Sequence, residues 1–273
     1  MSGPVIVRVT SGASHQSTAV EQLVHDVRLQ ADAFVFLSGG AAGMALSVRR
    51  RARTLLDALT MLASRGVRIA VGDGGTHAGL MKEAGLARRR GGNVFPLVGV
   101  APAPKLEAAA PWGVDPNHSH LVAVDNPQWT AVSGSARQEE QGAWGSETDV
   151  MFELFDRLAL ERASVALVIN GGALTLGEVA RHGASGRRMV VVTDSGRAAD
   201  AIACLLQGTE PAGRDPEDLT DIVRALDLLR YRRLYDLFPL AGAAESLAGV
   251  LERYLREGGP DPRPKAQGPK PGA

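Results

Sequence analysis

Glycine-rich turns that carry small polar residues follow apolar runs at four places in this chain of 273 residues. They are Thr10-Ser11-Gly12-Ala13, Gly72-Asp73-Gly74-Gly75-Thr76, Asn170-Gly171-Gly172 and Thr193-Asp194-Ser195-Gly196-Arg197, and each precedes a predicted helix. A helix N-terminus has backbone N–H groups without intrahelical partners and a partial positive charge, so it binds phosphate. Glycine lets the backbone approach an oxyanion closely. The four turns therefore predict a phosphate-handling site.

The elements that must position these turns are short apolar strands that alternate with amphipathic helices. The predicted strands are residues 5–9, 34–37, 67–71, 94–100, 121–124, 165–169 and 189–192, and the predicted helices are residues 20–29, 54–62, 78–87, 150–160, 175–181 and 198–206. This alternation predicts a Rossmann-like, doubly wound α/β fold with a mostly parallel sheet. In such a sheet the turns after the strands share one edge, where they could line one cleft.

The pattern changes after Gln207. Residues 218–229, 232–238 and 243–255 are apolar-periodic, and no strand is predicted between them. We predict one domain over residues 1–257, with a core at about 5–206 and a C-terminal helical cap at about 216–256. The proline-rich residues 258–273 predict a disordered tail. Residues 102–145 predict a long loop, a kind of segment that often carries function.

The composition excludes several classes of protein. The chain has 30 Lys and Arg residues against 30 Asp and Glu residues, so its charge does not favour a nucleic acid or a membrane surface as a partner. The arginine clusters 49–51 and 88–90 are interpreted as helix ends and solvated faces. Cys204 is the single cysteine, which excludes an internal disulfide. Without a targeting or transmembrane pattern, the sequence predicts a soluble, cytoplasmic protein.

Two familiar nucleotide-binding fingerprints are absent. Gly74 and Gly79 have the first half of a P-loop spacing, but Leu80 and Met81 stand where lysine and serine or threonine are needed. None of the four turns has the G-x-G-x-x-G pattern of dinucleotide-binding oxidoreductases. The sequence therefore disfavours both a P-loop NTPase and an ordinary dinucleotide-dependent oxidoreductase.

Four motifs resemble the SLOG superfamily, in particular the cytosolic SLOG (LSDAT) domain of TRPM-type channels and its free-standing prokaryotic relatives. The motifs are GGTHAGLM at 74–81, PWGVDPNHSH at 111–120, GGALT at 171–175 and DSGRAAD at 194–200. The resemblance extends from about Val5 to Leu206, and the transmembrane part of the channels has no counterpart here. It implies a soluble Rossmann-like domain that binds a nucleotide-derived ligand, ADP-ribose in one TRPM branch.

The resemblance also implies roles for individual residues. The turns at Thr10, Ser11 and Gly12 and at Gly171 and Gly172 would hold phosphates through backbone amides, and Arg197 would place its guanidinium on a phosphate. Trp144 could stack on a base. The full expected site is Thr10, Ser11, Gly12, Gly74, Gly75, Thr76, Asn117, Trp144, Gly171, Gly172, Thr175, Ser195, Gly196 and Arg197. Met151 replaces a phosphate-side arginine of the ADP-ribose branch, which argues against ADP-ribose itself.

A second resemblance leaves an enzymatic alternative open. Residues 171–178 are similar to the G-G-x-G-T-x-x-E motif of LOG-type phosphoribohydrolases, in which the glutamate takes part in cleaving a base–ribose bond. Glu178 could therefore be catalytic, as a nucleotide N-glycosidase would need. Leu174 replaces a motif glycine, and Glu178 is also a favourable acidic residue near a helix start.

The histidines add no separate prediction. His118 and His120 would share one face of a strand and could ligate a metal with Asp115 or Asp125, but the TRPM-like motif already accounts for both histidines. No metal and no further cofactor are expected. We expect a soluble sensor of ADP-ribose or a related nucleotide, with catalysis by Glu178 as the alternative. The helical cap could serve as a surface for a homo-oligomer.

Overall fold

The structure is a computed structural model that describes residues 3–11, 17–107, 113–126, 145, 147–211 and 220–257. Within these residues, eight strands form one sheet in the order β1-β5-β4-β3-β2-β6-β7-β8. Each neighbouring pair is parallel. The strands are β1 (Val5–Thr10), β2 (Ala33–Gly39), β3 (Ile69–Asp73), β4 (Leu97–Pro102), β5 (His120–Asp125), β6 (Ala163–Ile169), β7 (Arg188–Thr193) and β8 (Tyr235–Pro239). The α/β fold with a parallel sheet is as the sequence predicted.

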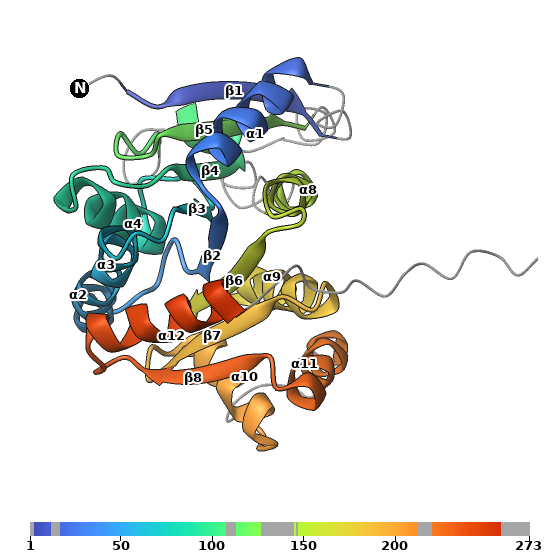
Figure 1. The fold of residues 1–273 in the computed structure, drawn as a ribbon. Helices are drawn as coiled ribbons and strands as arrows, with labels where there is room; N and C mark the ends of the chain where they lie inside the picture. Colours follow the sequence, from blue (N-terminus) through green and yellow to red (C-terminus); the bar gives the residue numbers. More distant parts are fainter. Residues whose placement is uncertain are drawn as a thin grey trace, which may run out of the picture.

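The six strands β4-β3-β2-β6-β7-β8 have the order 3-2-1-4-5-6 of a doubly wound dinucleotide-binding fold. From β2 the chain moves outward through β3 and β4 to β5, and it then returns to place β6 on the other side of β2. The direction of winding therefore reverses between β2 and β6. Strands β5 and β1 extend the sheet beyond β4, with β1 at its edge (Figure 1).

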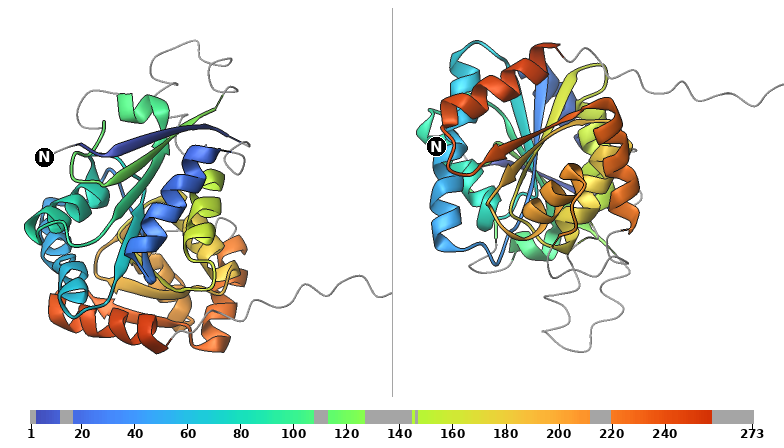
Figure 2. Two further views of the ribbon diagram at one scale, coloured as in Figure 1. Left: turned by 45° about the horizontal axis from the view of Figure 1, so that its top comes forward. Right: turned by 90° about the horizontal axis from the view of Figure 1, so that it is seen from below.

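Helices cover both faces of the sheet (Figure 2). One face packs against α2 (Leu46–Leu55), α3 (Asp57–Ser64), α4 (Gly79–Arg90) and α12 (Ala244–Glu257). The other face packs against α1 (Thr18–Gln30), α8 (Thr148–Leu158), α9 (Ala173–Ala184), α10 (Arg197–Gln207) and α11 (Thr220–Arg232). The short α5 (Ala103–Glu107) packs on β4 and β5.

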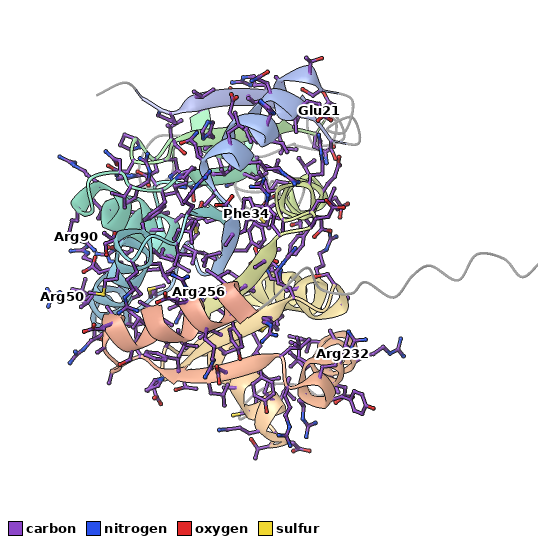
Figure 3. All side chains as sticks on the ribbon, in the orientation of Figure 1. Glu21, Phe34, Arg50, Arg90, Arg232 and Arg256 are labelled. Carbon is purple, nitrogen blue, oxygen red and sulfur yellow. The ribbon has the colours of Figure 1, made fainter. Side chains whose placement is uncertain are left out.

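The central strands are continuous apolar runs because both of their faces are buried. In β2, Val35 faces the α2–α4 side, whereas Phe34 and Phe36 face α1 and α8. The ring of Phe36 stacks on Phe155 with 4.3 Å between centroids. Phe34 accordingly lies in the interior, while Arg50 and Arg90 lie on the outer surface of the helical layer (Figure 3).

The C-terminal part differs from the sequence prediction. The sequence predicted only helices over residues 216–256, but β8 lies between α11 and α12 and pairs with β7, from Met189–Tyr235 to Thr193–Pro239. The segment is short, and only Phe238 among its five residues is fully buried, so its apolar signal is weak. The described part of this segment therefore completes the sheet and covers one of its faces, where the sequence suggested an appended cap.

Candidate functional site

The reversal of winding between β2 and β6 brings two glycine-containing loops together. In the sheet, Gly39 pairs with Ile169, and an added Cβ at Gly39 would lie 2.4 Å from the carbonyl oxygen of Ile169. An added Cβ at Gly40 would lie 3.5 Å from the Cα of Gly171. The chain after β2 therefore passes directly against the end of β6 and the turn that follows it, and the close approach at Gly39 leaves no room for a side chain.

Arg197 lies across this junction. Its Nη1 donates to the carbonyl oxygen of Ala42 at 2.8 Å. An added Cβ at Gly43 would lie 2.9 Å from Nη1, and one at Gly172 would lie 3.0 Å from Nη2. The guanidinium thus joins the loop after β2 to Gly172, the N-cap residue of α9. Its other N–H groups have no hydrogen-bond partner among the described residues, and the side chain is exposed.

The ends of β6 and β7 are fixed to each other by Asn170 and Ser195. The backbone N–H of Asn170 donates to Ser195 Oγ at 2.8 Å, and Ser195 Oγ donates to the carbonyl of Val192 at 2.6 Å. The Asn170 side chain donates through Nδ2 to the Ser195 carbonyl at 2.5 Å. Because Ser195 is fully buried and engaged in these bonds, it supports the turn from the interior of the protein. Asn170 Oδ1 is buried and has no partner among the described residues.

Three residues other than glycine adopt left-handed backbone conformations beside this junction. The φ angles are 58° at Asn170, 61° at Asp194 and 60° at Arg197. Such conformations cost about 1–3 kcal/mol each and cluster at functional sites. The hydrogen bonds of Asn170, and those from the N–H groups of Ala198 and Ala199 to the carbonyls of Gly171 and Asn170, hold this turn in place.

The N-termini of α9 and α10, which both lie at the junction, differ in which backbone N–H groups are left for a ligand. The first N–H groups of α10 are already bonded to the Gly171 and Asn170 carbonyls. At α9, the Gly172 N–H donates to Thr175 Oγ1 at 3.3 Å, and Gly172 has no side chain that could cap the next N–H groups of the helix. The α9 start is the one that faces the Arg197 guanidinium, so a phosphate placed there would meet both a helix dipole and a cation.

Two carboxyl groups, those of Glu178 and Glu147, lie near the N-terminal part of α9. Glu178 lies on the second turn of α9, near Ser38 at the end of β2. Burial raises the pKa of Glu178 to about 8, and the nearby Glu147 raises it further. Burial also raises the pKa of Glu147, at the start of α8, to about 7. The Gly145 N–H donates to Glu147 Oε2 at 2.8 Å. Both groups can therefore exchange protons near neutral pH.

A second cluster of charged groups lies on the other side of β3. His118 is fully buried between two carboxylates, with Nε2 2.8 Å from Asp73 Oδ1 and Nδ1 3.1 Å from Asp115 Oδ2. The two carboxylates outweigh the cost of burial and raise the pKa of His118 to about 9. Asn117 donates to Asp115 Oδ1 at 2.9 Å and belongs to this cluster. The arrangement is an internal ion triad, since Asp73 and His118 have no exposed side-chain surface.

The structure brings some of the predicted site residues together. Those at the β2–β6 junction are Gly171, Gly172, Thr175, Ser195, Gly196 and Arg197. Gly74, Gly75 and Thr76 follow the neighbouring strand β3, and α4 joins them to the junction because the Leu80 N–H donates to the Gly40 carbonyl at 3.1 Å. The Gly75 N–H is bonded to Asp73 Oδ1, and Thr76 is fully buried.

Other predicted residues lie apart from the junction. Thr10 ends β1 and Ser11 follows it at the edge of the sheet, five strand positions from β6, which is about 24 Å at the usual strand spacing. Asn117 lies in the His118 cluster. Gly12 and Trp144 lie outside the described residues. The strand order therefore does not bring all four turns together in a single cleft.

The sequence analysis missed the turn after β2. Ser38, Gly39 and Gly40 follow the apolar run 34–37, which is the same signal that marked the other turns. It also missed His182, which contacts Ser38, and Arg187, which contacts His182. No local pattern could have found them, because Ser38 and His182 are 144 residues apart in the chain.

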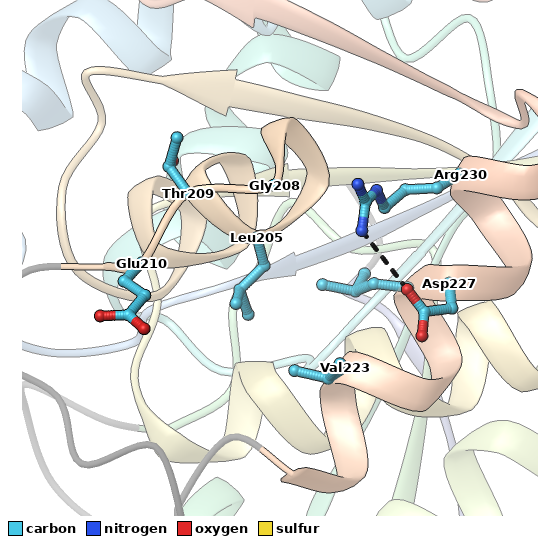
Figure 4. Close-up of a pocket in the computed structure, with 8 residues that line it drawn as sticks. Leu205, Gly208, Thr209, Glu210, Val223, Asp227 and Arg230 are labelled. Atoms are coloured by element: carbon cyan, nitrogen blue, oxygen red, sulfur yellow. Dashed lines mark hydrogen bonds and ion pairs between the residues drawn. The ribbon is translucent and has the colours of Figure 1, made fainter.

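Other kinds of site are not found in the described ranges. No group of three or more His, Cys, Asp or Glu residues there could hold a metal ion, and no described helix has the length and apolarity needed to cross a membrane. A small hollow of about 190 Å³ lies between α10 and α11, away from the junction (Figure 4). Leu205 and Val223 line it, and the Asp227–Arg230 ion pair closes one side.

The fold and the junction define a Rossmann-like α/β protein in which one arginine and one open helix start meet where the winding reverses. The family described as SLOG in TRPM, prokaryote, matches residues 32–233, most of the chain, and the chain belongs to that family. None of the curated proteins compared with the chain matches it. The matched residues include the whole junction and end just before β8.

Proposed function

We propose that the β2–β6 junction binds a nucleotide-derived signalling ligand, ADP-ribose or a related nucleotide, and that the protein acts as a sensor of it. The observation that carries this proposal is the position of Arg197, whose guanidinium lies between Gly43 and Gly172. Beside the start of α9 it has N–H donors without a partner in the described part of the chain. A planar guanidinium suits a phosphate, and the helix start adds backbone donors and positive potential. Membership of the SLOG family is compatible with such a ligand.

The proposal is tested by the thermal stability of the purified protein against ADP-ribose, NAD, cyclic ADP-ribose variants, AMP and cyclic dinucleotides. A ligand at 100 times its Kd stabilises the folded state by about 2.7 kcal/mol, which raises Tm by a few degrees. A shift with chemically intact ligand supports a sensor. If no member of the panel shifts Tm, the nucleotide proposal is wrong.

Arg197→Ala should weaken binding of the responding nucleotide by about 1.5–3 kcal/mol, because a charge-assisted contact to phosphate is lost. Calorimetric titration measures the change, and circular dichroism checks the fold. Arg50→Ala is the matched control, since Arg50 is exposed on α2 away from the junction. Equal affinity in the wild type and a folded Arg197→Ala variant would remove Arg197 from the site.

A second candidate function is hydrolysis of a base–ribose bond by Glu178. The observation that favours it is the position of this carboxyl beside the junction with its pKa raised to about 8, which suits a general acid at neutral pH. This candidate expects free base in a mixture of the protein with a nucleoside monophosphate or an NAD-like substrate.

Glu178→Gln should abolish base release and retain binding, because glutamine keeps the shape but cannot transfer the proton. Chromatography of the mixture measures the product, and Glu245→Gln on the exposed part of α12 is the control. Base release at the wild-type rate by Glu178→Gln excludes this role. No release from any substrate by the wild-type protein leaves the sensor as the supported function.

A further inference from the structure

The hollow between α10 and α11 is too small for a nucleotide. Its volume is about 190 Å³, whereas pockets for small molecules begin at roughly 300 Å³. Leu205, Val223 and Leu226 form its apolar lining, and Leu205 and Val223 point into it (Figure 4). Val223 is 39% exposed, so this lining is open to the outside. A hollow of this size and character suits one large side chain.

Polar groups surround the apolar lining of the hollow. Thr209 and Glu210 line the side formed by the end of α10, and Asp227 pairs with Arg230 at 3.4 Å on α11. Arg230 also reaches the end of α10, because an added Cβ at Gly208 would lie 3.1 Å from its Nη2. A matching side chain therefore has an apolar body and a polar end, which is the character of tyrosine.

Tyr231, in the last turn of α11, is a tyrosine that does not pack on its own chain. Its side chain is 88% exposed, the highest value among the large apolar side chains in the described part of the protein. The opposite face of α11 packs on the sheet through Ile222 and Leu229. Tyrosine residues that fill a pocket of a partner contribute much of the binding energy of protein–protein contacts. Tyr231 therefore has the character that the hollow requires.

The spacing along α11 lets two copies of the helix satisfy each other. Val223 lies four residues before Asp227 and Tyr231 four residues after it, and all three are exposed. At 3.6 residues per turn, their side chains leave the helix within about a quarter of a turn of one another. If two copies of α11 pack antiparallel with a two-fold axis beside Asp227, Tyr231 of each copy lies opposite Val223 of the other. Both copies then use the same surface, so the assembly stops at two.

The charges on the exposed face of α11 suit the same antiparallel arrangement. Arg224 and Arg230 are exposed three residues before and three residues after Asp227. In the antiparallel pair, the two Asp227 carboxylates lie near the axis, and the arginines of the other copy flank each of them. At the rim of the hollow, the exposed Glu210 can accept a hydrogen bond from the hydroxyl of an entering tyrosine. The face is therefore electrostatically complementary to a second copy of itself.

We propose that the protein forms a two-fold symmetric dimer through α11, in which Tyr231 of each copy occupies the hollow between α10 and α11 of the other. Each copy contributes one helix and the end of a second, so the contact belongs to the small interfaces that form weak complexes, with a Kd of about 10–100 µM. Leu205 lines the hollow near the last residue of α10, whereas Arg197 begins that helix at the junction. The dimer therefore leaves the nucleotide site open and does not depend on it.

Sedimentation equilibrium of the ligand-free full chain over about 5–500 µM covers the expected Kd and should show monomers and dimers in exchange. Tyr231→Ala should weaken dimerisation by about tenfold or more, because the side chain that fills the hollow is lost from both copies. Leu29→Ala on α1 is the matched control, since Leu29 is a 63% exposed apolar residue outside this surface. A protein that stays monomeric, or a dimer that Tyr231→Ala does not weaken, overturns the proposal.

A mixture of two variants tests the two-fold arrangement itself. Val223→Trp fills the mouth of the hollow and keeps Tyr231, whereas Tyr231→Ala keeps the hollow and lacks the side chain that fills it. Each variant alone should dimerise poorly, but the mixed dimer regains one of the two contacts and should be tighter than either homodimer. Sedimentation with one labelled variant measures the mixed dimer, and circular dichroism checks that both variants fold. A mixture no tighter than the separate variants, or assembly beyond a dimer, overturns the two-fold arrangement.

Discussion

The Arg197 residue combines a functional side chain with an unfavourable backbone conformation. Its φ of 60° lies in the left-handed region, which glycine adopts without steric cost and other residues adopt at about 1–2 kcal/mol. The next turn of the chain needs that conformation, because the N–H groups of Ala198 and Ala199 must reach the Gly171 and Asn170 carbonyls. We interpret the strain as the cost of placing a guanidinium at the junction.

A comparison of two substitutions at Arg197 tests this interpretation. Arg197→Gly and Arg197→Ala both remove the guanidinium, so both should weaken nucleotide binding to the same extent. Only glycine relieves the backbone, so Arg197→Gly should be more stable than Arg197→Ala by about 1 kcal/mol in urea unfolding. Equal stability of the two variants would mean that the position is not strained.

The buried His118 triad makes stability depend on pH. The pKa of His118 is about 9 in the folded protein, above the usual 6.5, so its stabilisation is fully present below pH 6.5 and is lost as the pH rises toward 9. The pKa values of the Glu147 and Glu178 carboxyls are raised too. The ionisation of these two groups therefore also lowers the stability of the folded protein as the pH rises. The contribution of His118 to this pH dependence is therefore measured as the difference in the free energy of unfolding between the wild type and a His118 variant.

Urea unfolding of the wild type and His118→Gln at pH 6.5, 7.5 and 9 measures that contribution. The wild type should be more stable than the variant by a few kcal/mol at pH 6.5, and the difference should shrink toward pH 9. His25→Gln on the surface of α1 is the control for the loss of a histidine. A difference that does not change with pH would mean that His118 is neutral in the folded protein.

Among the elements, α12 contributes most to one face of the sheet although it lies beyond the residues that match the family. Its side chains at 247, 248, 251, 254 and 255 are buried against α3 and β6. They have the helical spacing of three and four residues that produces one apolar stripe. The helix thus closes the core that β2, β6 and β7 share with α2, α3 and α4.

Two substitutions two residues apart on α12 should have opposite effects. Leu251 is fully buried, so Leu251→Ala should lower the free energy of unfolding by about 2–5 kcal/mol. Gly249 is exposed, and an added Cβ there would meet no atom within 4 Å. Gly249→Ala should therefore raise the free energy of unfolding by about 0.5–1 kcal/mol, since alanine favours the helix. Urea unfolding measures both, and a small effect of Leu251→Ala would contradict the packing described for α12.

The sequence predicted seven of the strands because buried parallel strands are continuous apolar runs with glycine or polar residues at their ends. It missed β8, in which Tyr235, Asp236 and Leu237 are only partly buried and the apolar signal is short. At the candidate site, the sequence pointed to Gly171, Gly172, Arg197 and Glu178, whose signals are local turns and a motif. It could not find the contact of Ser38 with His182, since this contact depends on which elements become neighbours in the fold.

At the scale of the molecule, the described residues form a six-stranded doubly wound unit with β5 and β1 added at one side. The proposed site uses the point where the six-stranded unit reverses its winding, as in other open α/β sheets. The added strands move the Thr10 turn to the far edge, so a glycine turn after a strand does not by itself mark the ligand cleft. The order of the strands decides which turns can act together.

The edge position of β1 also sets an order of events during synthesis. Val5 pairs with His120, so a ribosome that adds roughly 5–20 residues per second needs about 6–23 s to make the partner of β1 after β1 itself. During that time the nascent chain carries an apolar strand that has no partner. We therefore expect β1 to depend on chaperones at the ribosome until β5 has been made.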